Sequence, residues 1–337
     1  MSIHDSHRTL CPVAGLLVML LAFPSCNPSN SVNPEPVSKD FQLLATIVDA
    51  MGEQGYQQLR MPNPEEYAAI PQDPNNPLTV DKVKLGRMLF HETALGTQAR
   101  EESGMGTFSC ASCHHATAGF QAGVQQGLGD GGVGFGIRGE GRVISDAYQP
   151  NEIDRQPMRS PTAMNGAFTP VTLWNGQFGA AGPNVGTEAN WTSGTPIAVN
   201  YLGYLGLETQ AIAGLTVHRM APDAAFFDAL PGYVPLFDAA FPDFAEDQRY
   251  TVETAGLAIA AYERTIMGYE APFQQWLRGQ HSAMTESQKN GAMVFFGAAQ
   301  CGTCHNGPGL TDGGFHALGM PDMPGIEALD ALSLIHI

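Results

Sequence analysis

Positive charge is scarce in this sequence, and charge of either sign is uncommon. Only 15% of the 337 residues are charged, and 33 acidic against 16 basic side chains give a formal net charge of −17. Such a surface repels nucleic-acid phosphates and anionic membranes, so we expect neither as a partner. It would attract a small basic protein, although an acidic surface also simply keeps an exported protein soluble. The 43% hydrophobic content excludes a disordered chain.

Cysteine is equally sparse, and none of the six is left for a structural disulfide. Four belong to two C-x-x-C-H motifs, and the other two, Cys11 and Cys26, lie near the N-terminus. This excludes the disulfide scaffold that holds many small exported domains together. Strand patterns are weak throughout, whereas glycine (39) and proline (24) are frequent, as expected when long loops wrap a cofactor.

Residues 1–26 are typical of an export signal. Their apolar run, residues 13–23, is too short for a membrane span and follows a polar start. Ser25 and Cys26 resemble a bacterial lipoprotein cleavage site, so we expect Cys26 to become the lipidated first residue of a membrane-tethered protein. Cleavage at a nearby bond, which leaves Cys26 free, is the alternative. Residues 27–40, rich in Asn, Pro and Ser, predict a flexible tether.

The most informative feature of the chain is a repeated C-x-x-C-H motif, which is the signature of covalent c-type haem attachment. Two thiols at this spacing can add to the two vinyl groups of one haem, and the following histidine then binds the iron. A zinc ribbon needs no obligatory histidine, and a thioredoxin-like pair would sit at a strand-to-helix turn. We therefore expect two covalently bound haem c groups, one held by Cys110, Cys113 and His114 and the other by Cys301, Cys304 and His305.

The rest of the chain has a helical pattern. Apolar residues recur at helical spacing after residue 41, at 79–91 and at 252–267, and Thr285 with Gln288 forms a capping box ahead of the second motif. Each motif thus follows an amphipathic helix, which is a weak internal duplication. We expect a mainly α-helical protein with two cytochrome c-like domains, each wrapped around one haem, at residues 41–268 and 269–337.

A glycine-rich loop at 120–142 contains two formal matches to the dinucleotide-binding pattern G-x-G-x-x-G, at 127–132 and 134–139. Neither follows an apolar strand, and no βαβ pattern surrounds them, so we do not expect a dinucleotide site. The glycines more simply allow the backbone to pass close to the haem face.

The order of short motifs along residues 71–319 resembles the bacterial dihaem cytochrome c peroxidases. This family includes the dihaem enzyme that matures methylamine dehydrogenase. The order of the motifs is far more specific than any one of them. The motifs that carry the resemblance lie at 85–90, 109–114, 159–162, 173–176, 207–211, 260–265, 301–308 and 315–319.

The resemblance implies a division of labour between the two haems. The haem on His114 would bind hydrogen peroxide, and the haem on His305 would take electrons from a small cytochrome c or cupredoxin in the periplasm. Trp174 stands where the family keeps an indole between the haems, which implies an electron relay; packing against a haem edge is the alternative. Dimers are usual in the family, which leaves a homodimer open.

We therefore expect a cytochrome c peroxidase that reduces hydrogen peroxide to water. Two alternatives stay open: a dihaem oxidase that modifies a protein substrate, and a dihaem cytochrome that only transfers electrons. The sixth iron ligand of the second haem would discriminate the two enzymes, because Met favours the peroxidase and Tyr favours the protein-modifying oxidase.

The chain departs from the family on the peroxide side of the first haem. Many members place a distal histidine after the first motif, but no histidine occurs here between His115 and His218. We therefore predict a five-coordinate or water-bound iron at His114. Gln210 matches a family glutamine, and the family's distal glutamate position falls at Arg219, next to His218. These two could move a proton and stabilise the departing anion, or they could be surface or haem-propionate contacts.

The chain also departs from the family at the calcium site and at its C-terminal end. Arg159 stands where the family uses an Asn to bind calcium, so the resemblance does not extend to the calcium site. In the family, the sixth ligand of the second haem comes from a segment well beyond residue 319. Met320 and Met323 are weak substitutes, and residues 332–337 match a translated sequencing adapter, so we expect an incomplete second domain with an artefactual end.

Overall fold

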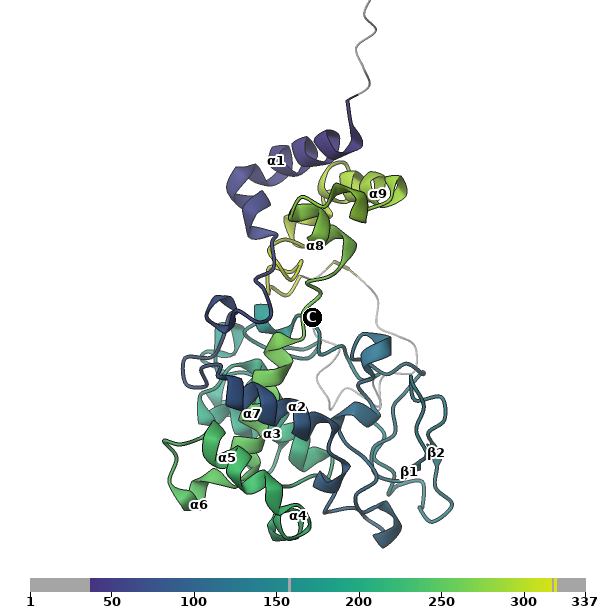
Figure 1. The fold of residues 1–337 in the computed structure, drawn as a ribbon, viewed down its shortest axis with the longest axis vertical. Coiled ribbons are helices and arrows are strands. Elements are labelled where there is room, and N and C mark those ends of the chain that lie inside the picture. Colours follow the sequence, from purple (N-terminus) through teal and green to yellow (C-terminus); the bar gives the residue numbers. More distant parts are fainter. Residues whose placement is uncertain (1–36, 157–158, 317, 320–337) are drawn as a thin grey trace, which may run out of the picture. The chain divides into compact units, whose positions relative to one another are not determined.

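A computed structural model describes residues 37–156, 159–316, 318 and 319 (Figure 1). The expected export signal, Cys26, most of the tether, Met320, Met323 and residues 332–337 lie outside the described residues. Within the described part, the chain is mainly helical, as the sequence predicts. No helix there is long and apolar enough to cross a membrane.

Helix α7 (Val252–Thr265) is the buried centre of the larger helical group. It begins at a capping box formed by Thr251 and Thr254, and nearly every residue from Thr254 to Arg264 is buried. Helices α2 (Val80–His91) and α3 (Gly206–Val217) pack against it (Figure 1). The sequence prediction of helices at 79–91 and 252–267 is confirmed.

Glycines allow these three helices to approach closely. A Cβ atom on Gly86 of α2 would lie 1.7 Å from the carbonyl oxygen of Ala258 in α7. On the other side of α7, a Cβ atom on Gly256 would lie 2.5 Å from Cγ1 of Ile212 in α3. No larger side chain fits at either crossing unless the helices move apart.

Three shorter helices complete this core. They are α4 (Ala224–Ala229), α5 (Val234–Ala240) and α6 (Glu246–Arg249). Aromatic rings fill the space between them and the larger helices, and several meet edge to face or tilted, which suits their charge distribution. The fully or nearly fully buried rings are Phe226, Tyr233, Phe237 and Phe241.

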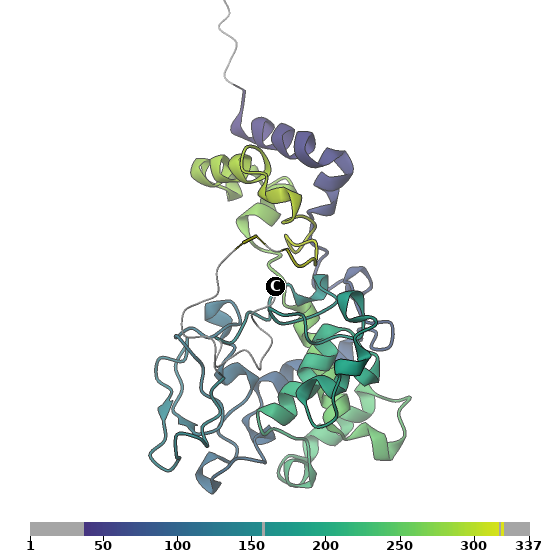
Figure 2. The ribbon, with the colours of Figure 1, turned by 180° about the vertical axis from the view of Figure 1, so that it is seen from behind.

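A second apolar cluster joins the first helix to the C-terminal part of the chain. Helix α1 (Lys39–Gln58) packs against α9 (Glu286–Phe296), and α8 (Pro272–Leu277) shares the same cluster (Figures 1 and 2). Asp40 accepts hydrogen bonds from Lys289 at 2.8 Å and from the indole of Trp276 at 2.7 Å. The Thr285–Gln288 capping box at the start of α9 is confirmed. The expected domain boundary at residue 268 stays a prediction.

Between α2 and α3 the chain runs mainly through loops and short 3-10 turns. The only sheet among the described residues is a hairpin of β1 (Gly132–Val133) and β2 (Val143–Ile144). The G-x-G-x-x-G matches therefore lie in a loop and its hairpin, without the helix of a dinucleotide fold. At Gly127 the backbone passes so close to the first haem motif that a Cβ atom would lie 2.6 Å from Sγ of Cys113.

The close crossing of α2 and α7 can be tested by adding one methyl group. Gly86→Ala should lower the free energy of unfolding by about 3 kcal/mol or more, because the new Cβ meets backbone that cannot yield cheaply. The matched control is Gly291→Ala in α9, where nothing lies within 4 Å of the new Cβ. The control should stabilise the protein by up to about 1 kcal/mol through helix propensity. Urea unfolding of the haem-loaded proteins measures both, and equal midpoints would contradict the proposed packing.

Candidate functional site

A cavity of about 500 Å³ opens beside the first C-x-x-C-H motif. Helix α3 lines it with Gln210, Gly214 and Val217, which share one helix face at spacings of four and three residues. Helix α7 contributes Ile259 and Glu263, one turn apart. Gly214 of α3 has no side chain and so leaves room for a flat ligand. The rest of the lining comes from the motif itself and from loops, including Cys110, Cys113, His114, Asp154, Trp174 and His218.

The first motif forms a tight turn that presents His114 to the cavity. Residues Cys110–Ser112 make a 3-10 turn, and the backbone N–H of His114 donates to the carbonyl of Cys110 at 2.9 Å. Nδ1 of His114 lies 3.0 Å from the carbonyl oxygen of Phe120, which can only accept, so Nδ1 carries the proton and Nε2 keeps its lone pair. Burial lowers the pKa of His114, which favours the neutral form that binds metal. His114 is therefore in the neutral form, with its lone pair on Nε2, that can bind a metal.

The two thiols of this motif are shielded from solvent by the surrounding protein. Burial raises the pKa of Cys113 to about 12 and raises that of Cys110 as well, so both are neutral thiols at physiological pH. A reactive redox pair or a zinc site would need stabilised thiolates. Together with the cavity, this donor set fits a haem better than either alternative.

The second motif repeats the local plan of the first. Nδ1 of His305 lies 3.1 Å from the carbonyl oxygen of Leu310, as Nδ1 of His114 does from that of Phe120. A phenylalanine from the end of the preceding helix lies beside each histidine: Phe90 beside His114, and Phe295 beside His305. Unlike His114, His305 is exposed. The two histidines thus have the same tautomer and different access to solvent.

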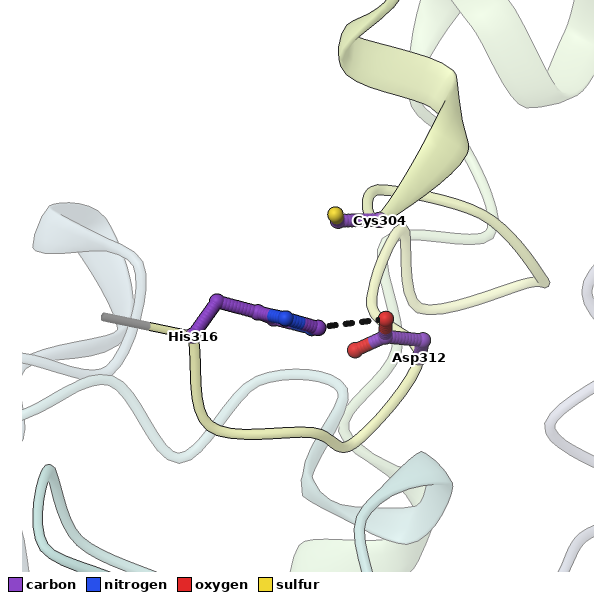
Figure 3. A group of neighbouring side chains, drawn as sticks. All are labelled: Cys304, Asp312 and His316. Carbon is purple, nitrogen blue, oxygen red and sulfur yellow. Dashed lines mark hydrogen bonds and ion pairs between the residues drawn. The ribbon is translucent and has the colours of Figure 1, made fainter. Parts of the chain in front are cut away.

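One group beside the second motif has the composition of a metal site. Single ligand atoms of Cys304, Asp312 and His316 lie within 4.8 Å of one another, and Nε2 of His316 is 2.8 Å from Oδ2 of Asp312 (Figure 3). Asp312 and His316 are exposed. With the sulfur of Cys304 attached to haem, as the motif predicts, only two ordinary ligands would remain, which is too few for a zinc site.

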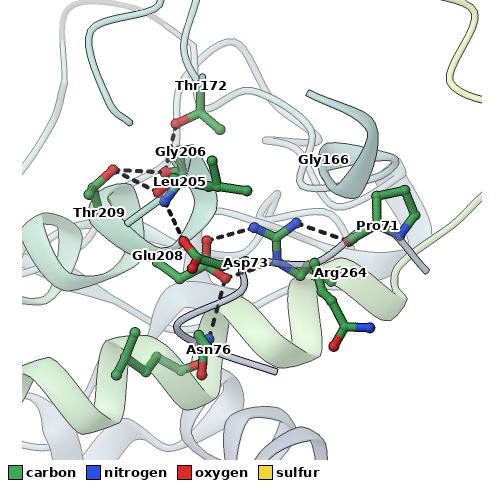
Figure 4. A network of polar contacts seen from close by, with 12 residues as sticks. Pro71, Asp73, Asn76, Gly166, Thr172, Leu205, Gly206, Glu208, Thr209 and Arg264 are labelled. Atoms are coloured by element: carbon green, nitrogen blue, oxygen red, sulfur yellow. Dashed lines mark hydrogen bonds and ion pairs between the residues drawn. The ribbon is translucent and has the colours of Figure 1, made fainter. Parts of the chain in front are cut away.

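A buried ion pair fixes the two helices that wall the cavity. Arg264 of α7 donates from Nε and Nη2 to the two carboxylate oxygens of Glu208 in α3, at 2.8 and 2.6 Å (Figure 4). Its third contact, from Nη1, is the carbonyl oxygen of Pro71 at 3.1 Å, and Asn76 donates to Glu208 at 3.3 Å. This bidentate geometry fixes the position of α3 along α7 and so places Gln210 and Glu263 in the same cavity.

The structure brings three of the four predicted catalytic residues to the cavity. Gln210, His218 and Trp174 line it, and Trp174 is 73% exposed. Arg219 does not line it. Its guanidinium turns to a loop, where Nη1 lies 2.6 Å from Oδ2 of Asp130 and 2.5 Å from the carbonyl oxygen of Glu152. The expected joint action of His218 and Arg219 therefore has no support in the geometry.

His218 instead pairs with a residue that carries no sequence signal. Its Nδ1 lies 2.7 Å from Oδ2 of Asp154, a carboxylate in the loop after the hairpin. Asp154 also lines the cavity, and its side chain is only 5% exposed. No motif surrounds Asp154, and 64 residues separate it from His218, so local pattern could not reveal the pair.

Glu263 is a second cavity residue that the sequence did not single out. It is buried, and its Oε2 has no hydrogen-bond partner among the described residues. Burial raises the pKa of Glu263 to about 8, helped by the nearby charge of Glu208, so the carboxyl is mostly protonated at neutral pH. The only signal in the sequence is a carboxylate inside an otherwise apolar helix pattern.

Comparison with known proteins gives one consistent family. The family described as "Di-haem cytochrome c peroxidase" matches residues 80–282. "Methylamine utilization protein MauG" of Methylorubrum extorquens is 28% identical over 75% of this chain and 57% of its own length. "Cytochrome-c peroxidase IdrP1" of Denitromonas iodatirespirans is 29% identical over 79% of this chain and 57% of its own.

Two more matches are weaker in sequence. "Cytochrome c551 peroxidase" of Pseudomonas aeruginosa is 24% identical over 80% of this chain. A crystal structure of "a MauG-like protein associated with microbial copper homeostasis" shares the fold, with a TM-score of 0.50 and 24% identity over 78% of this chain and 62% of that one. This chain spans a little over half the length of the curated relatives it matches.

The neutral state of Glu263 can be tested through the pH dependence of stability. Its ordinary pKa of 4.5 is raised to about 8 in the folded protein, so between these values only the folded state holds the proton. The parent protein should therefore lose stability as the pH rises through this window. Glu263→Gln keeps the shape of the side chain but does not titrate. Its free energy of unfolding at pH 9 should therefore exceed that of the parent by up to about 5 kcal/mol.

Urea unfolding of the haem-loaded proteins at pH 5, 7 and 9 measures this difference. The two proteins should converge as the pH approaches 4.5. Glu65→Gln, at an exposed carboxyl, is the control and should follow the parent at every pH. If Glu263→Gln also follows the parent, the buried carboxyl is not the neutral group described here.

Proposed function

The chain belongs to the di-haem cytochrome c peroxidase family, and from this premise we propose that it reduces hydrogen peroxide to water in the His114 cavity. Electrons would arrive through a second haem at His305. One observation carries the proposal: the two C-x-x-C-H turns have the same local structure, but their histidines differ in exposure to solvent. His114 faces a cavity lined by Gln210 and His218, whereas His305 is exposed.

The family implies haem cofactors, and the residues of both motifs fit them. Cys110 and Cys113 would each add S–H across one vinyl group of the first haem, and Cys301 and Cys304 across those of the second, so that no oxidant is needed. His114 and His305 would bind the irons through Nε2, because Nδ1 is occupied in both. When bound, the haem supplies an iron that takes up peroxide and passes electrons singly.

The residues of the cavity would manage the protons. Nε2 of His218 would take a proton from the incoming peroxide and return it to the departing oxygen, which then leaves as water. The amide of Gln210 would donate a hydrogen bond to the peroxide and orient it. Because the net reaction consumes protons as well as electrons, a base that can be reprotonated from solvent suits this position.

Trp174 would relay electrons between the two haem sites. It lies at the cavity, and its turn also contacts the segment that follows the second motif, since a Cβ atom on Gly176 would lie 2.4 Å from the ring of Phe315. The turn therefore reaches both halves of the chain. An exposed indole in a turn that contacts both parts of the chain is suitable as an electron relay.

We place this activity in the bacterial periplasm, with a small cytochrome c or cupredoxin as donor and a lipid anchor at Cys26. The acidic surface supports a basic donor. A second candidate function is the oxidation of a protein substrate. The similarity to two methylamine utilization proteins favours this alternative.

Peroxide turnover is the direct test. Stopped-flow mixing of the haem-loaded protein with hydrogen peroxide and reduced cytochrome c should oxidise the cytochrome, and His114→Gly should bring the rate to background. His91→Ala, at an exposed histidine outside the cavity, is the control. The resting protein should hold two haems per chain, with a high-spin ferric EPR signal from the first. An electron-transfer cytochrome would instead leave peroxide unconsumed and show only low-spin iron.

The relay is tested separately by Trp174→Phe. This change should slow cytochrome oxidation at least about tenfold, which corresponds to about 1.4 kcal/mol of activation free energy, with haem content and peroxide binding unchanged. Trp191→Phe is the matched control, because Trp191 is buried and does not line the cavity. Full turnover in Trp174→Phe would leave Trp174 as a packing residue.

A further inference from the structure

We infer that Asp154 is a positioning residue, which holds His218 so that Nε2 faces the peroxide cavity as a base. The inference rests on the proposed function and deepens it, because it names the group that orients the proton-transfer residue. Asp154 would act through His218 alone.

The contact between the two side chains sets the tautomer of His218. Oδ2 of Asp154 lies 2.7 Å from Nδ1 of His218, and a carboxylate can only accept there. Nδ1 then carries the proton, and Nε2 keeps a lone pair. The carboxylate also stabilises the imidazolium that forms when Nε2 takes a proton, as in other carboxylate–histidine pairs. The side chain of Asp154 is almost fully buried while that of His218 is 35% exposed, so His218 can exchange protons with solvent.

The loop around Asp154 is built to bring its carboxylate to this position. A Cβ atom on Gly129 would lie 2.2 Å from Oδ2 of Asp154, so only glycine leaves room for it. The backbone N–H of Gly129 donates to the carbonyl of Asp154, and that of Asp154 donates to the carbonyl of Asp130. The second carboxylate oxygen accepts from Gln156 at 3.2 Å. Both oxygens of Asp154 therefore have partners, and its rotation is restricted.

Arg219 anchors the turn that carries His218. Helix α3 ends at Val217, His218 is its C-cap, and Arg219 has a left-handed backbone with φ of 59°. Its guanidinium binds the buried carboxylate of Asp130, which also accepts from the backbone N–H of Arg100 at 2.8 Å. The turn after α3 is thereby tied to the loop that holds Asp154. Of these two adjacent residues, His218 would thus transfer the proton, and Arg219 fixes the backbone of the turn.

The test uses hydrogen cyanide, which must lose its proton before it binds ferric haem and needs no electron donor. Asp154→Asn replaces the acceptor with an amide that can donate to Nδ1, which favours the tautomer with the proton on Nε2. We expect cyanide association and the peroxide reaction to slow about 100-fold, the usual size of one acid–base contribution. Haem content and the absorption spectrum should stay unchanged, and Asp154→Glu should recover part of the rate. Asp146→Asn, at an exposed carboxyl of the neighbouring loop, should match the parent.

A second variant keeps the inference falsifiable if Asp154→Asn takes up no haem. His218→Gln leaves Asp154 in place and should slow cyanide association to the same extent. Where both variants fold, the double variant should lose no more than either alone, because the two residues act as one unit. Parent-like cyanide association in either single variant would overturn the inference. So would a low-spin resting signal that becomes high-spin in His218→Gln, because His218 would then be an iron ligand.

The same measurements separate this inference from the proposed function. If the parent does not oxidise reduced cytochrome c with peroxide, the proposed function fails. Cyanide association that still depends on Asp154 and His218 would then support the pair as an oriented base in a haem cavity with another substrate. Peroxide turnover without dependence on Asp154 would support the function and reject the inference.

Discussion

The ion pair between Arg264 and Glu208 is the constraint on which the site depends. Arg264 is 1% exposed and Glu208 is 0% exposed, so both charges have lost their hydration and must meet with good geometry. Two parallel hydrogen bonds permit one alignment of α3 along α7. Gln210 follows Glu208 by two residues in α3, and Glu263 directly precedes Arg264 in α7, so this alignment brings both to the same cavity. A shift of either helix would leave a buried charge without its partner.

Close backbone contacts at four glycines support the same arrangement. Gly86 and Gly256 bring α2 and α3 against α7, and Gly127 and Gly129 bring the glycine-rich loop against Cys113 and Asp154. Gly86 and Gly256 allow helices to pack closely, whereas Gly127 and Gly129 allow the loop to pack against residues of the site. At these last two positions, the missing side chains make room for the sulfur of one residue and the carboxylate of another.

Features with a local cause could be predicted from the sequence. The two C-x-x-C-H turns, the helices before them and the Thr285–Gln288 cap depend on residues a few positions apart, and all are found. Features that join distant segments could not be predicted. The sequence places His218 beside Arg219, but Asp154 and Asp130 pull the two side chains to different partners. Helix α1 joins α9 through Asp40 and Lys289, which no local pattern indicates.

The neutral thiols of Cys110 and Cys113 bear on the order of events during biogenesis. In the closed fold they are half-buried in the wall of the cavity, where desolvation disfavours ionisation and makes sulfur a poor nucleophile. A chain that closed before it received its porphyrin would hold these sulfurs in an unreactive state. Thioether bonds at this motif would therefore form more readily while the segment is still open, and the helices would close around the cofactor afterwards.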